Sequence, residues 1–218
     1  MIGVFSDSHG DLDAFDAAYE LLRAKGAKRF IFAGGRYADL DEWIIQRRQA
    51  ARGGRSYSDA DFLADVTNFL AAREQVERPP AFSGDDDTIE LDRVKERFVR
   101  VPDKDSLQYL DAAVPKKAMD MLGDTLCCVV HDKNDLTRED LLNSAVFIHG
   151  KEKEPQVVQI GPRYFVTPGK LTGAAEQTCG LIEVVERDLR FSAFRLDGRV
   201  LVDGHPLTVD RRTKLSVK

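Results

Sequence analysis

The chain has 218 residues, and 43% of them are hydrophobic, which is enough for one hydrophobic core of ordinary domain size. Its 37 acidic and 32 basic residues give a formal net charge of -5, so nucleic acid is not an expected partner, because sequence-independent binding needs a broad basic surface. No segment reaches the roughly 20 apolar residues of a membrane-spanning helix, so a membrane is not expected either.

The cysteines and the first residues favour the cytoplasm. The chain has three cysteines, of which Cys127 and Cys128 are adjacent, and neighbours of this kind rarely bridge each other. With Cys179 the count is odd, so no disulfide framework is expected. The apolar run at residues 1–5 is too short for the apolar part of a signal peptide.

The N-terminal part predicts a strand, a helix and a second strand. The apolar run at 1–5 opens into the polar loop 6–10, and Asp11 can cap a helix whose apolar residues recur at helical spacing up to Gly26. Residues 29–33 form the next apolar run. This order predicts a parallel pair of strands joined by a right-handed crossover.

The middle of the chain has a helical character. Helices are predicted at 40–51 and 60–74, and a polar connection follows at 83–87. Strand character returns at 98–101. We therefore predict a helical insertion at about 40–97.

The remaining sequence predicts mainly strands. Thr137, with Asp140 three residues later, predicts the start of a short helix, and Gly161-Pro162 and Asp197-Gly198 predict turns between strands. Strands are expected at 125–130, 145–148, 157–160, 164–166, 181–185, 191–196 and 200–202. Together with the N-terminal elements, this pattern indicates a layered α/β fold.

Polar residues follow several of these strands, where open α/β sheets place their ligands. They are Asp7 and His9, then Gly34-Gly35, then 102–105, then His131, and then 150–153. This order resembles the calcineurin-like metallophosphoesterases, in particular their small bacterial and archaeal phosphodiesterase branch. That family has D-x-H, G-D, G-N-H/C-D, a histidine after a strand, and G-H-x-H, each in a loop after a strand.

Two stretches carry most of the resemblance. The sequence FSDSHGDLDAF around Asp7 is close to the family's first motif, and residues 147–173 look like its closing motif except at the metal ligands. The resemblance covers residues 1–36 and 98–202. It implies an α/β fold, an αββα sandwich of two mixed sheets flanked by helices. We expect a single domain over 1–218 that contains the helical insertion at about 40–97.

The resemblance also implies which metal ligands are kept. Family members hold two divalent ions that activate a water for attack on phosphorus. The positions that keep a ligand type are Asp7, His9, Asp103 and His131. They could retain at most one ion, Mn, Fe or Zn, and otherwise no cofactor is expected.

Other motif positions have lost their ligands. Gly35 stands where the family has the bridging aspartate, Lys104 where it has a histidine or cysteine, and Lys151 and Lys153 where it has the two histidines of G-H-x-H. A unit charge pair at about 4 Å is worth near 4 kcal/mol at an effective dielectric of 20, so an ammonium beside a dication is repelled by about twice that. Two lysines could instead neutralise Asp7 and Asp103 without an ion.

Three functional hypotheses follow. The first is a catalytically impaired protein that acts by binding or scaffolding, with a protein partner or a second copy held by the inserted helices. The second is a metal-dependent phosphodiesterase or phosphatase with an altered or single-ion site. The third is a module that binds a phosphate-bearing ligand through Arg36, Lys104, Lys151 and Lys153.

Overall fold

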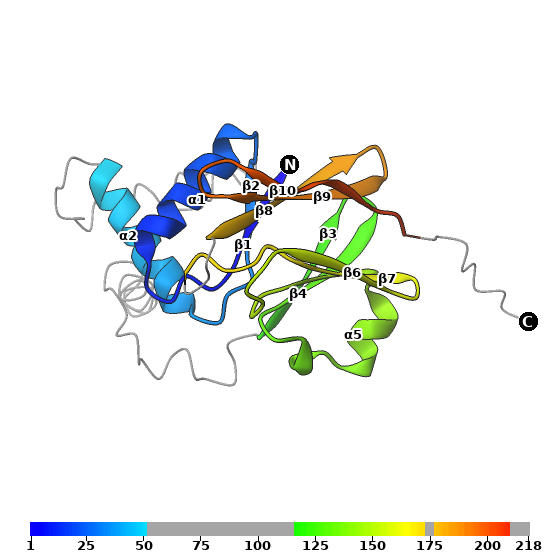
Figure 1. Cartoon of the computed structure of the whole chain (residues 1–218). Helices are drawn as coiled ribbons and strands as arrows, with labels where there is room; N and C mark the ends of the chain where they lie inside the picture. Colours follow the sequence, from blue (N-terminus) through cyan, green and yellow to red (C-terminus); the bar gives the residue numbers. More distant parts are fainter. Residues whose placement is uncertain (52–115, 173–176, 210–218) are drawn as a thin grey trace, which may run out of the picture. The chain divides into compact units, whose positions relative to one another are not determined.

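The computed structural model describes residues 1–51, 116–172 and 177–209 (Figure 1). The chain divides into two compact units, one of Met1–Asp39 with Leu107–Lys218 and one of Leu40–Ser106. The helix predicted at 60–74 and the strand predicted at 98–101 lie outside the described residues. A single domain with an insertion at about 40–97 stays a prediction, and the sheets and the candidate site below belong to the first unit.

Apart from β3 and a short 3-10 turn, the described elements follow the predicted order. In the N-terminal part they are β1 (Ile2–Phe5), α1 (Leu12–Ala24), β2 (Arg29–Phe32) and α2 (Tyr37–Ala51), the last of which crosses the boundary between the two units. The later elements are β3 (Lys117–Leu122), β4 (Thr125–Val130), a 3-10 turn (Lys133–Asp135), α5 (Arg138–Asn143), β5 (Val146–His149), β6 (Gln156–Ile160), β7 (Arg163–Thr167), β8 (Thr178–Val185), β9 (Asp188–Arg195) and β10 (Val200–Leu207). No helix of the described ranges is long and apolar enough to cross a membrane.

The strands form two mixed sheets. Sheet A has the order β10-β9-β8-β1-β2, and sheet B has the order β3-β4-β5-β7-β6. The pair β1–β2 is parallel, as predicted, and so are β4–β5 and β5–β7, whereas the other pairs with a known register are antiparallel. The parallel strands bring their carboxyl ends together, which positions the loops of the candidate site.

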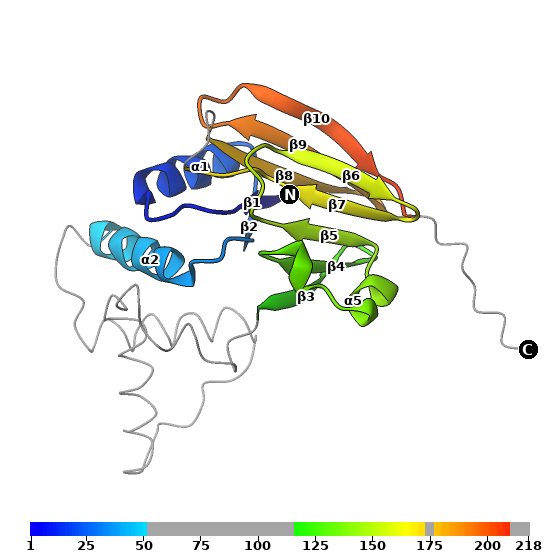
Figure 2. The same cartoon turned by 60° about the horizontal axis from the view of Figure 1, so that its bottom comes forward.

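The hydrophobic core lies between the two sheets. Val4 and Ile182 of sheet A and Ile148 and Val166 of sheet B are fully buried members of one cluster. Helix α1 covers the other face of sheet A, where the rings of Phe15 and Phe5 meet edge to face at 4.6 Å, and α5 lies against the outer face of sheet B (Figure 2). The predicted αββα sandwich is therefore confirmed.

The local signals in the sequence differ in how well they predicted the elements. Asp11 accepts a hydrogen bond from the backbone N–H of Ala14, and Thr137 and Asp140 form a full capping box, as expected. Strand β3 was missed because it does not alternate cleanly, with Met119 exposed and few of its side chains buried. Strand β10 extends five residues beyond its predicted end at 202, because a register irregularity between Val202 and His205 accommodates Gly204 and the pairing with β9 then continues through Pro206.

Candidate functional site

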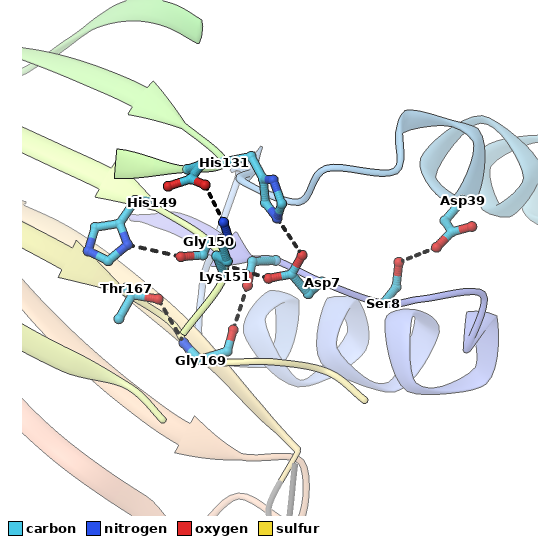
Figure 3. A network of polar contacts seen from close by, with 11 residues as sticks. Asp7, Ser8, Asp39, His131, His149, Gly150, Lys151, Thr167 and Gly169 are labelled. Carbon is cyan, nitrogen blue, oxygen red and sulfur yellow. Dashed lines mark hydrogen bonds and ion pairs between the residues drawn. The ribbon is translucent and has the colours of Figure 1, made fainter. Parts of the chain in front are cut away.

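Four loops meet at the carboxyl ends of the parallel strands, and together they form the candidate site (Figure 3). They follow β1, β2, β4 and β5, as the motif order predicts. The loop after β7 joins them, because the hydroxyl of Ser6 donates to the carbonyl of Gly169 at 2.6 Å and the N–H of Leu171 donates to the carbonyl of Asp7 at 3.2 Å.

Asp7 is the centre of this site. Its side chain is almost fully buried, and each carboxylate oxygen has a direct protein partner. Oδ1 lies 2.8 Å from Nε2 of His131, and Oδ2 accepts from the backbone N–H of Lys151 at 2.6 Å. Burial alone would raise the pKa of Asp7, but these two hydrogen bonds and the nearby charges of His131 and His9 outweigh it and hold the pKa below its usual value.

The ring of His131 occupies the space beside Gly35. A Cβ atom on Gly35 would lie 2.7 Å from both Nδ1 and Cε1 of His131, which is closer than carbon atoms of this kind approach in folded proteins. The resemblance places a bridging aspartate at this position. The absence of a side chain at Gly35 is therefore what allows the imidazole to reach Asp7.

Gly150 fixes the approach of the loop after β5. Its Cβ would lie 2.3 Å from the carbonyl oxygen of Ala33 and 2.9 Å from Cδ2 of His131. Its N–H lies 3.3 Å from the carbonyl oxygen of Val130 and 3.1 Å from that of His131. Any side chain here would push the loop away from β2 and β4, so glycine is required by close backbone packing.

The structure corrects the expected role of Lys151. The ammonium was expected to pair with Asp7 or Asp103, but it pairs with Asp132, and Asp103 lies outside the described residues. The backbone of Lys151 adopts the left-handed conformation, with φ 67°, and this directs its N–H to Asp7. The side chain itself is exposed.

A second ion pair links the same two loops. Lys133, after β4, contacts Glu152, after β5, at 2.7 Å. The pKa of Glu152 is lowered by its hydrogen bond to Lys133, and the pKa of Asp132 is lowered by its hydrogen bond to Lys151. Lys153 is exposed and has no ion pair within the described ranges. The loops after β4 and β5 are thus connected by two salt bridges, one with its lysine after β4 and the other with its lysine after β5.

Asp39 is a site residue that the sequence reasoning missed. It is fully buried, and its Oδ2 accepts from the hydroxyl of Ser8 at 2.8 Å and from the N–H of Gly10 at 2.6 Å. It therefore fixes the loop after β1 on both sides of His9, which is exposed and has a left-handed φ of 47°. No motif pointed to Asp39, because it lies within a helix and contacts a loop that is distant in sequence.

The remaining candidates are placed only in part. Arg36 lies 3.6 Å from Oδ1 of Asp39, so its guanidinium is already directed towards a carboxylate. Lys104 lies, like Asp103, outside the described residues. His149, at the end of β5, is buried, and its Nδ1 lies 3.0 Å from the carbonyl of Gly150. Burial lowers its pKa, so the neutral ring is favoured.

The described residues do not fit a two-metal centre. Within ranges 1–51, 116–172 and 177–209, no group of three or more histidine, cysteine, aspartate or glutamate side chains could hold an ion. Asp7 and His131 contact each other directly, and neither Gly35 nor the exposed Lys151 offers a ligand. The described side chains of the site thus pair with one another, and Asp103, the further expected ligand, lies outside the described residues.

The fold and the order of the described loops are those implied by the resemblance to calcineurin-like phosphoesterases. No protein-family model and no curated protein matches the sequence. Similar solved structures include a predicted phosphoesterase from Streptococcus pneumoniae TIGR4, with 16% identity, 94% of each chain covered and a TM-score of 0.48. The phosphoesterase Yfce from E. coli has 17% identity, with 92% of this chain and 96% of that chain covered and a TM-score of 0.48.

A third similar structure is a novel archaeal phosphodiesterase. It has 15% identity and a TM-score of 0.47, and the match covers 87% of this chain and 97% of that chain. All three similarities are distant.

Proposed function

We propose that this chain is a metallophosphoesterase-fold protein that has lost two-metal hydrolysis and acts by binding or scaffolding. The observation that carries the proposal is the position of the His131 ring. It fills the space beside Gly35 and contacts Asp7 directly, so the side chains that would surround an ion are packed against one another.

The contacts of Asp7 support the same conclusion. Both of its oxygens already accept from protein donors, His131 and the backbone of Lys151. An incoming ion would have to break at least one of these buried, charge-assisted hydrogen bonds, and each such bond is worth about 1.5–3 kcal/mol. An ion held only by Asp7 and the partly exposed imidazole of His131 gains little in return.

The two salt bridges between the loops supply a structural substitute for ions. In a two-metal centre the ions would join the loops after β4 and β5. Here Lys151 with Asp132 and Lys133 with Glu152 join them through side chains alone. The loops can keep their arrangement without bound metal, which suits a protein that uses the fold as a rigid surface.

A single-ion enzyme is the second candidate. It is favoured by the proximity of Asp7 and His131 and by the charge of His9, which helps to lower the pKa of Asp7. Such a site would need Asp103 as a further ligand. The phosphate-binding candidate is weaker, because Arg36 and Lys151 are already directed to Asp39 and Asp132.

Metal analysis and hydrolysis assays test the proposal together. The full chain, purified without chelator, is expected to hold less than one Mn, Fe or Zn per chain. With added Mn²⁺, hydrolysis of bis-p-nitrophenyl phosphate and p-nitrophenyl phosphate is expected to equal that of the Asp7→Ala variant. About two ions per chain, or turnover that Asp7→Ala abolishes, would contradict the proposal that the chain has lost two-metal hydrolysis. One ion per chain with such turnover would establish the single-ion enzyme.

The proposal includes a protein partner and a cytoplasmic location. The predicted insertion at about 40–97 is the region we expect to bind a protein partner, and deleting it should abolish partner capture. The three free cysteines are all buried, which suits a reducing cytoplasm.

A further inference from the structure

The described strands leave four sheet edges, β10 and β2 in sheet A and β3 and β6 in sheet B. An edge strand presents unpaired N–H and C=O groups to which another strand can bind. Proteins normally prevent this with short strands, charged side chains, prolines or bulges on the edge. The four edges of this chain differ clearly in these features.

Three of the edges carry such protection. Strand β2 has only four residues and begins with Arg29. Strand β3 carries Lys117 and Asp120. Strand β10 has two register irregularities and contains Asp203 and Pro206.

Strand β6 has none of these features. Its sequence, Gln-Val-Val-Gln-Ile, contains no charge, proline or glycine, and it pairs with β7 in regular register at all five positions. Val158 is 40% exposed and Ile160 is 60% exposed. Short, uncharged segments of high β propensity are the ones that most readily accept a further strand.

Val158 also ends an apolar row that crosses the outer face of sheet B. Neighbouring members of this row are paired across all five strands, and they are Met119, Cys128, Phe147, Phe165 and Val158. In its centre, the rings of Phe147 and Phe165 stack at 4.8 Å. The row is buried in the middle and exposed at both ends, so a strand added beside β6 would extend it.

We propose that β6 pairs in antiparallel register with β6 of a second copy, with Val158 opposite its own counterpart. Strand β6 carries no charged side chain, so two copies of it do not repel each other, although the whole chain has a net charge of -5. Antiparallel pairing places Val158 of both copies on one two-fold axis, so the same residues of β6 meet from each side. The contact is isologous and closes after two chains.

This contact is independent of the loss of hydrolysis and lies outside the insertion at about 40–97. It continues sheet B across a two-fold axis into a sheet of twice the number of strands. Because one pair of five-residue strands is a small interface, the association is expected to depend on concentration.

The oligomeric state of the full chain tests the proposal. Sedimentation velocity over a concentration series is expected to show the wild type approaching twice the chain mass of 24.4 kDa. Val158→Lys, which places a charge on the edge, is expected to remain at the single-chain mass. Met119→Lys is the matched control, because Met119 ends the same row at the opposite edge with a similar exposure of 46%. It should associate like the wild type.

A cysteine at the centre of the strand gives a second, independent readout. Residues directly opposite in an antiparallel pair lie within reach of a disulfide. Val158→Cys is therefore expected to form a covalent dimer on mild oxidation, while the wild type does not, because its own cysteines are buried. Thermal melts show whether each variant is folded.

Three results would overturn the proposal. The first is a wild-type protein that stays a single chain at every concentration. This holds even if that protein binds an extended peptide at the β6 edge instead of a second copy. The second is equal dissociation by Val158→Lys and Met119→Lys. The third is a folded Val158→Cys variant that fails to cross-link.

Discussion

The loop after β1 and the loops after β4 and β5 hold their charged groups in different ways. In the first, Ser6, Asp7 and Ser8 are all buried, and each side chain has a hydrogen-bond partner from another loop or helix. In the others, the ion pairs of Lys151 and Lys133 lie at the surface. Both sets of loops belong to the same strand ends, so the difference lies in burial and not in position.

This difference predicts which substitutions each set of loops tolerates. Removing the buried carboxylate of Asp7 leaves its hydrogen-bond donors without an acceptor, so this residue should matter for stability whether or not an ion is bound. An exposed position loses little when its ligand is replaced, because water solvates whatever stands there. Side-chain changes after β5 should therefore cost less stability than changes in the loop after β1.

The largest effect is expected from Asp7→Ala. It leaves Nε2 of His131 and the N–H of Lys151 without their acceptor at a partly buried site, so the free energy of unfolding should fall by about 1–3 kcal/mol for each of the two donors. Urea denaturation measures the change. Asp7→Asn keeps one carbonyl acceptor and should lose less. A loss under about 1 kcal/mol for Asp7→Ala would mean that water replaces the carboxylate.

Gly35→Ala should have the next largest effect. The new methyl group would lie 2.7 Å from the His131 ring, and forcing the ring away costs about 1–3 kcal/mol through overpacking and the weakened contact with Asp7. In a His131→Ala background the same substitution should cost much less, because the obstructing ring is gone. A double-mutant cycle with urea denaturation measures this coupling. Additive effects would show that the crowding at Gly35 comes from elsewhere.

The sequence predicted those parts of the molecule that depend on local pattern. Apolar runs and turn residues located most strands, and Asp11 and Thr137 correctly marked helix starts. It failed at β3 and at the end of β10, where side-chain burial or hydrogen-bond register, and not residue type, defines the strand.

The candidate site was predicted less completely than the fold. Strand ends identified Asp7 and His131, because position after a strand is visible in a sequence. The partner of Lys151 and the role of Asp39 were not visible, because both depend on which loops meet in three dimensions. The glycine at position 35 did not show that the ring of His131 fills the space beside it.

Acid should weaken the contact between α5 and β3. Asp140 accepts from Lys117 at 2.5 Å and from the N–H and hydroxyl of Thr137, and its pKa is lowered from 3.8 to about 2, mainly by Lys117. Because the pKa is lower in the folded state, this contribution to stability is fully present above about pH 4 and is lost as the pH falls towards 2. The free energy of unfolding should therefore fall less steeply in Asp140→Asn than in the wild type over this range. Parallel pH profiles would contradict this assignment.

The smallest effect is expected from Lys151→Ala, which tests the exposed half of the comparison directly. The substitution removes the ion pair with Asp132 but keeps the backbone N–H that binds Asp7, so the melting temperature should hardly change. Lys151→Gly removes the same ion pair and also relieves the left-handed backbone at φ 67°, so it should melt at a temperature equal to or above that of Lys151→Ala. Differential scanning calorimetry at low and high salt separates the two contributions, because only the ion pair is screened. If Lys151→Ala lowered the melting temperature as much as Asp7→Ala, the ammonium of Lys151 itself would have to stabilise the buried carboxylate. The loops after β4 and β5 would then not differ from the loop after β1 in the way that burial implies.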